Sequence, residues 1–69
     1  MKVSQLILDK IKNDREFRQY TAIALGVTER NVELLAERKS DNLTKYKAVI
    51  YYKSTGLEDK DIFEAETIN

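Results

Sequence analysis

The side chains best suited to chemistry in this chain are gathered in one short stretch, ERNVELLAE, at residues 29–37. Glu29, Glu33 and Glu37 recur at every fourth position, and Arg30 stands among them. On an α-helix these three carboxylates would form an acidic stripe along one face, because residues four apart are neighbours on its surface. Carboxylates accept hydrogen bonds and a guanidinium group donates them. The stretch is therefore equipped for recognition through charge and hydrogen bonding.

Catalysis finds little support in the composition. The chain has no histidine and no cysteine, which excludes His-dependent acid–base catalysis, disulfides and thiolate metal sites. A zinc site built from carboxylates alone would be unusual, and the chain has no glycine-rich phosphate loop. We therefore expect no enzyme activity, no metal and no cofactor.

The acidic stretch is expected to form the second of two short helices joined by a tight turn, over about residues 18–37. Ala22 would let the two helices cross closely, and Gly26 can adopt the positive φ of the turn without steric cost. Thr28 is a favoured residue for the N-cap of the second helix. The apolar residues that would bury between the helices and the rest of the domain are Val27, Val32 and Leu35. This spacing is typical of a helix-turn-helix.

Three further helices are expected around this pair. Apolar residues spaced three and four apart from Val3 to Ile11 predict one helix before the pair. Asp14 follows it and can cap the first helix of the pair, which is expected to begin at about Arg15. A polar loop at residues 38–42 then leads to a fourth helix, which is stopped by a glycine. The apolar stripe of the fourth helix would be Leu43, Tyr46, Val49 and Ile50, and a short fifth helix would place Ile62 and Phe63 against the core.

Size and composition favour one small helical domain. With 69 residues, two glycines and no proline, the chain is expected to form a single all-α, five-helix domain over residues 1–69, frayed at 67–69. Charged residues near the N-terminus interrupt the apolar stretch that a signal peptide or membrane span would need. A cytoplasmic protein without a membrane partner is therefore expected. The twelve basic and twelve acidic residues cancel, with a surplus of acidic ones after residue 57.

The run ALGVTERNV, followed by Leu35, resembles the lambda repressor and Cro family of phage-type regulators. The likeness continues through the polar loop, the helix containing residues 43–53 and the stop at 55–57, so it covers nearly the whole chain. Thr21 stands where this family usually has a larger aliphatic residue, and Tyr52 where a small one is common. The resemblance implies a lambda-repressor-like DNA-binding domain and a sequence-specific transcriptional regulator. Such a repressor would cover its operator in double-stranded DNA as a homodimer.

The resemblance also implies a set of site residues. Carried over position by position, it places five exposed side chains toward DNA: Arg18, Glu29, Arg30, Glu33 and Leu34. Thr28 and Asn31 lie close enough to help, and Asn31 could read adenine. Arg30 could donate two hydrogen bonds to guanine, and Leu34 could contact a thymine methyl group. Phosphate contacts that set the register would come from Lys39, Asn42 and Lys45.

The acidic stripe leaves several interpretations open. One glutamate could accept a hydrogen bond from cytosine, or Arg30 and Arg38 could neutralise the stripe. In an interpretation without a role in DNA binding, Arg30 only pairs with Glu33 on a solvated helix face. Alternatively, the acidic face binds another regulatory protein, and the chain is a protein-interaction module of the same fold, such as an antirepressor.

Three tyrosines form a second cluster. Tyr46 is expected in the core, because aromatic residues at helical spacing usually pack inside. Tyr51 and Tyr52 cannot both share the face of Ile50, so at least one should be exposed. The exposed ring could form a homodimer contact together with Ile62, Phe63 or Ile68.

Overall fold

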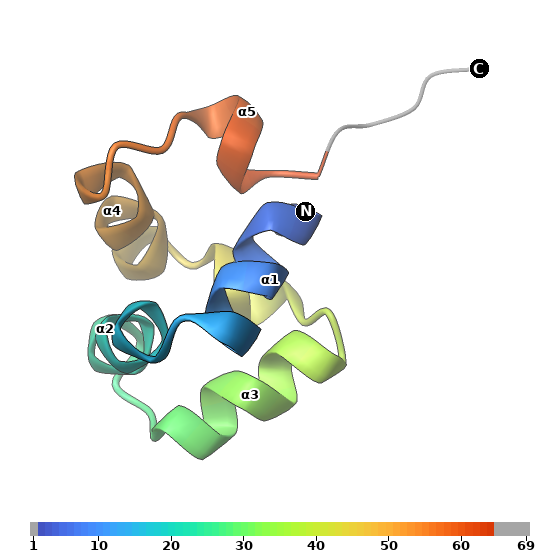
Figure 1. Ribbon diagram of the computed structural model, residues 1–69, viewed down its shortest axis with the longest axis vertical. Coiled ribbons are helices and arrows are strands. Elements are labelled where there is room, and N and C mark those ends of the chain that lie inside the picture. The colour runs from blue at the N-terminus through green and yellow to red at the C-terminus, as the bar shows by residue number, and fades with distance from the viewer. Residues whose placement is uncertain (1, 65–69) are drawn as a thin grey trace.

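The computed structural model describes residues 2–64 (Figure 1). Along the chain its elements are α1 (Gln5–Asn13), α2 (Arg15–Leu25), α3 (Glu29–Glu37), the 3₁₀ helix η1 (Asp41–Thr44), α4 (Tyr46–Ser54) and α5 (Asp59–Ile62). The described residues contain five α-helices and no strand, which confirms the expected all-α, five-helix architecture. Every helix in this part of the chain is too short or too polar to span a bilayer. The fraying expected at 67–69 falls outside the described residues.

Local capping sets the boundaries of α2 and α3. Asp14 Oδ1 accepts a hydrogen bond of 3.2 Å from the Phe17 amide in the first turn of α2. Gly26 ends α2 with a φ of 70°, in the left-handed region. Thr28 Oγ1 then accepts a hydrogen bond of 3.1 Å from the Asn31 amide at the start of α3. The predicted pair of helices and the glycine turn between them are therefore confirmed.

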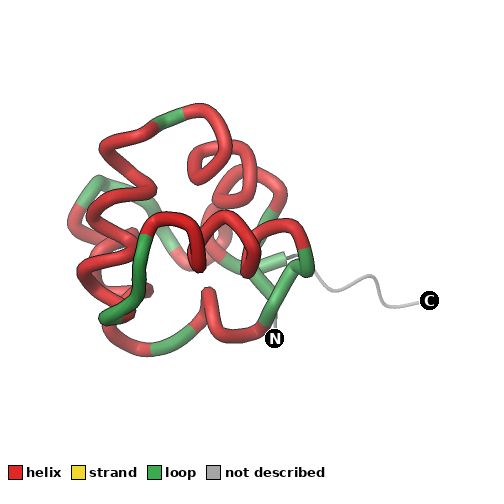
Figure 2. The backbone as a smooth tube through the Cα atoms, turned by 90° about the horizontal axis from the view of Figure 1, so that it is seen from below, coloured by secondary structure: helices red, strands yellow, loops and turns green. Residues whose placement is uncertain are grey.

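The core lies where α2 packs against α1, α3 and α4. Figure 2 shows how short the loops between the helices are. The buried apolar side chains that fill the core include Ile7, Ile11, Phe17, Ala22, Val32, Leu43, Ala48, Tyr52 and Ile62. Burying each of the larger ones contributes roughly 1.5–3 kcal/mol. Val27 and Leu35, which were expected to bury with Val32, are half-buried and pack against this cluster.

The two ends of the described chain meet beside α5. Val3 and Phe63 form an isolated antiparallel bridge, and next to it the Ser4 amide donates a hydrogen bond of 2.7 Å to the Ile62 carbonyl. Val3 is thus buried, as its place in the apolar pattern predicts, although it lies before α1 and not within it. The bridge and the buried Ile62 side chain hold α5, which has only four residues, on the core.

The fourth helix begins later than the sequence predicts. Leu43 is buried, but it belongs to η1, and Lys45 separates η1 from α4 with an extended ψ of 149°. The core side of α4 is therefore defined by Ala48 and Tyr52, which are four residues apart. At roughly 100° per residue, a side chain two positions from Ala48 points away from the core. The prediction that Tyr46 is buried is accordingly wrong: its side chain is among the most exposed apolar ones, at 79%.

Ile50 is displaced from the core for the same reason. It lies midway between Ala48 and Tyr52 in sequence and is 49% exposed. The prediction that it lines the apolar stripe of the fourth helix is therefore wrong as well.

The prediction that Tyr51 or Tyr52 is exposed is also wrong. Tyr52 is fully buried, and its hydroxyl donates a hydrogen bond of 3.0 Å to the Leu43 carbonyl. Its ring stacks on Phe17 with centroids 5.5 Å apart, while Tyr51 is half-buried between Phe17 and Tyr20. These rings stabilise the contact between α2 and α4. Of the residues suggested for a homodimer contact, Ile62 is fully buried, so that part of the prediction is wrong, and Ile68 lies outside the described residues.

Candidate nucleic-acid interface

The outward face of α3 is formed by residues that follow the i, i+4, i+7 pattern. Val32 is fully buried and anchors the opposite side of the helix. Arg30 and Glu37 are exposed, and Leu34 between them is half-buried. Thr28 caps the helix at its start. The structure thus presents Arg30 and Leu34, two of the predicted base readers, on the free side of α3.

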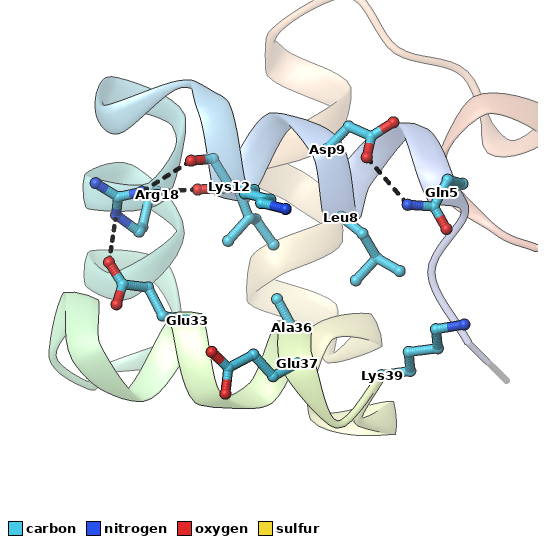
Figure 3. Close-up of a pocket in the computed structure, with 10 residues that line it drawn as sticks. Gln5, Leu8, Asp9, Lys12, Arg18, Glu33, Ala36, Glu37 and Lys39 are labelled. Carbon is cyan, nitrogen blue, oxygen red and sulfur yellow. Dashed lines mark hydrogen bonds and ion pairs between the residues drawn. The ribbon is translucent and has the colours of Figure 1, made fainter.

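Arg18 does not lie on an exposed face, so this part of the prediction is wrong. Its side chain is only 16% exposed. Nη1 donates hydrogen bonds to the carbonyl oxygens of Ile11, at 2.9 Å, and Lys12, at 3.4 Å. The last carbonyls of a helix lack intrahelical partners and carry partial negative charge, which attracts a guanidinium group. Arg18 therefore ties the start of α2 to the end of α1 (Figure 3).

The same guanidinium group faces two of the glutamates on α3. Arg18 Nε lies 3.6 Å from Glu29 Oε1 and 3.5 Å from Glu33 Oε1. This nitrogen is buried and has no hydrogen-bond partner within residues 2–64, so it meets the carboxylates through charge alone. Arg15 Nε adds a longer contact of 3.9 Å to Glu29, and Arg30 Nη1 lies 3.3 Å from Glu33 Oε2.

Two members of the acidic stripe are therefore compensated within the domain. The Glu29 and Glu33 side chains are each only 38% exposed. Arg30 contributes as expected, whereas Arg38 makes no ion pair in the described part of the chain. Arg15 and Arg18 take its place. Glu37 is the exposed member, and it has no ion pair within residues 2–64.

A shallow cavity of about 140 Å³ joins the turn of the helix-turn-helix to η1. Its lining brings together predicted base-contact and phosphate-contact residues from α3, η1 and the start of α4: Asn31, Leu34, Asn42 and Lys45. Arg38 lies at the same edge. The structure thus places these residues on one side of the outward face of α3.

Lys39 is separated from the other predicted phosphate contacts. It lines a larger cavity of about 430 Å³ between α1 and α3, together with Glu33 and Glu37 (Figure 3). Its carbonyl oxygen accepts a hydrogen bond of 2.9 Å from Lys2 Nζ, and its φ of 51° is left-handed. Lys39 thus provides the left-handed residue that follows α3.

The sequence interpretation missed Arg15 as a partner of the acidic stripe. The only signal was opposite charge, since Arg15 opens α2 and Glu29 opens α3, but the whole length of α2 separates the two residues in sequence. The carbonyl partners of Arg18 had no signal, because every residue carries a carbonyl and only the fold selects Ile11 and Lys12.

Comparison with known proteins adds no relative. No family model matches this chain, and neither a curated protein nor a solved structure matches it significantly.

Proposed function

We propose that this protein is a sequence-specific DNA-binding transcriptional regulator, a cytoplasmic repressor of the phage or prophage Cro type. In this proposal α3 enters the major groove of an operator in double-stranded DNA, and α2 crosses the phosphate backbone. The observation that carries it is the capped turn around Gly26, which leaves Arg30 and Leu34 on the free side of α3. With its side chains an α-helix is about 10–12 Å across, comparable to the width of the major groove, about 12 Å.

The ion pairs on α3 support this proposal. Three exposed glutamates would oppose entry into a groove lined by phosphates, because like charges repel. Glu29 and Glu33 instead contact three arginines, at positions 15, 18 and 30. Their combined charge is therefore offset inside the domain. Of the stripe, only Glu37, which also lines the cavity between α1 and α3, has no ion pair within residues 2–64.

The edge beside the outward face supports a backbone contact. Asn42 and Lys45 are exposed and line the same cavity as Asn31 and Leu34. In a complex with α3 in the groove, they would contact phosphates and fix the register of base recognition. A domain of this size covers one half-site, so we propose that it binds as a homodimer, with its two α3 helices about 34 Å apart.

Glu37 favours a second candidate function. The same fold could act as a protein-interaction module, and an exposed, unpaired carboxylate on α3 would suit a basic surface on another regulatory protein. This alternative uses the acidic face of α3 as a whole, and two of its three glutamates, Glu29 and Glu33, are already paired within the domain. DNA binding is therefore the function that the geometry supports better.

Selection from a random duplex library with the full chain tests the proposal. We expect enrichment of a palindrome whose half-sites are centred about one helical turn apart, and binding that weakens steeply as salt rises. A library from which the folded protein enriches no sequence would contradict it. Capture of a protein partner with little salt dependence would favour the interaction module instead.

A further inference from the structure

Glu33 contacts two arginines at once. Its Oε1 lies 3.5 Å from Arg18 Nε, and its Oε2 accepts a hydrogen bond of 3.3 Å from Arg30 Nη1. Arg18 is in turn bonded to the carbonyls of Ile11 and Lys12. A continuous chain of polar contacts therefore runs from the end of α1 to Arg30, whose own side chain is 72% exposed.

In the structure this chain of contacts ends at Arg30, whose guanidinium group is hydrogen-bonded to Glu33. A free arginine side chain has many rotamers, and fixing one of them on binding is unfavourable. Glu33 already selects a rotamer through one of the five N–H groups of the guanidinium. The remaining groups still suffice for the two parallel hydrogen bonds that arginine makes to the O6 and N7 atoms of guanine.

We propose that Glu33 is a positioning residue that sets base specificity by holding Arg30 for a guanine contact. This inference rests on the DNA-binding function proposed above. Glu33 itself need not touch DNA, because both of its carboxylate oxygens already face arginines. The pair between Arg30 and Glu33 is an exposed i, i+3 pair, a kind that contributes little to stability. Its effect should therefore be found in recognition and not in folding.

The test compares Glu33→Gln with Glu37→Gln, a matched control that removes the same charge from the same helix. Arg30→Ala first identifies the guanine that Arg30 reads, by competition among duplexes that each differ from the selected one by a single base pair. One bidentate contact discriminates roughly 5- to 150-fold between bases. We expect Glu33→Gln to lose about three- to fivefold of the preference at that position, the upper end of what an exposed ion pair contributes, with other positions unchanged. Glu37→Gln removes an unpaired charge from the same face, so it should change the affinity for all duplexes alike and keep this preference within about twofold.

A double-mutant cycle separates positioning from a general structural effect. In the Arg30→Ala background, Glu33→Gln should change the preference at this position by less than about twofold, because the side chain it positions is already absent. Circular dichroism and thermal melting of each variant check that α3 remains folded.

Several outcomes would overturn the inference. Glu33→Gln could retain the full guanine preference, lose only a preference at a neighbouring cytosine, or lose no more than Glu37→Gln does. Each of these, with a wild-type protein that still selects an operator, would reject the positioning role alone. A wild-type protein that selects no duplex would reject both this inference and the proposed function.

Discussion

Arg18 Nε lies 3.5 Å from Glu33 Oε1, so that a basic side chain from the start of α2 contacts an acidic side chain in the middle of α3. The same guanidinium group is bonded to the Ile11 carbonyl at 2.9 Å. One side chain therefore links three helices on the side of α3 that faces the domain. An arginine that the family resemblance placed toward DNA instead contacts α1 and α3 within the domain.

Replacing Arg18 should destabilise the fold. Arg18→Ala removes hydrogen bonds to the end of α1 and leaves two half-buried glutamates without their central partner. We expect the free energy of unfolding to fall by about 2 kcal/mol, as for other hydrogen bonds to charged groups. Urea denaturation measures this change. Arg38→Ala is the control, since Arg38 is exposed and makes no ion pair within residues 2–64, and it should stay within about 0.5 kcal/mol. Equal stabilities of the two variants would contradict the role of Arg18.

The buried hydroxyl of Tyr52 should contribute to stability through Leu43. Tyr52→Phe keeps the ring packed on Phe17 but removes the hydrogen bond of 3.0 Å, so that a buried carbonyl loses its donor. We expect a loss of about 1–2 kcal/mol in the free energy of unfolding, measured with denaturant. Tyr46→Phe, at an exposed position, should be neutral. A neutral Tyr52→Phe would show that the hydrogen bond has no net effect.

The buried Tyr52 side chain should also make the protein less stable in alkaline solution. Burial raises the pKa of Tyr52 above its ordinary value of 10. Below pH 10 the Tyr52 hydroxyl keeps its proton in both the folded and the unfolded states. Above pH 10 the hydroxyl loses its proton in the unfolded state, while burial retains the proton in the folded state. The free energy of unfolding should then fall by up to about 1.4 kcal/mol per pH unit. Unfolding of the wild type and of Tyr52→Phe, followed from about pH 8 to about pH 11, should show a shallower decline in the variant. Parallel curves would contradict the assignment, since Tyr51, whose pKa burial also raises, is present in both proteins.

Lys39 occupies a backbone conformation that suits glycine. Its φ of 51° is left-handed, a conformation that strains most side chains. Lys39→Gly should raise the free energy of unfolding by roughly 0.5–1 kcal/mol, after allowing for the greater freedom of glycine in the unfolded chain. Thermal denaturation tests this sign. Lys47→Gly, within α4, should have the opposite effect, a loss of similar size. Destabilisation by both substitutions would show that the turn after α3 is not strained.

The sequence predicted best the helix boundaries that are set by interactions within a single turn of the chain. Asp14, Gly26 and Thr28 each act on the backbone of their own turn, so their types and spacing located α2 and α3. The prediction of where α4 begins was wrong because Leu43 and Tyr46 have helical spacing. No local feature of the sequence shows that the chain becomes extended at Lys45.

The candidate site was predicted in part. Arg30, Asn31, Leu34, Asn42 and Lys45 lie at or beside the outward face of α3, as the helical spacing and the family resemblance suggested. Arg18 was misplaced because its partners come from α1 and α3, and such long-range contacts exist only in the folded domain. The buried Tyr52 was missed for the same reason, since its hydroxyl finds its acceptor in η1.

The most direct test of the account is the binding of Arg30→Ala to the selected operator and to a shuffled duplex of the same composition, measured by fluorescence anisotropy. We predict that the wild type prefers the operator and that the variant loses roughly 5- to 150-fold of this preference, with unchanged helical circular dichroism. A folded Arg30→Ala protein that binds the operator as tightly and as selectively as the wild type would contradict the assignment of α3 as the helix that reads DNA.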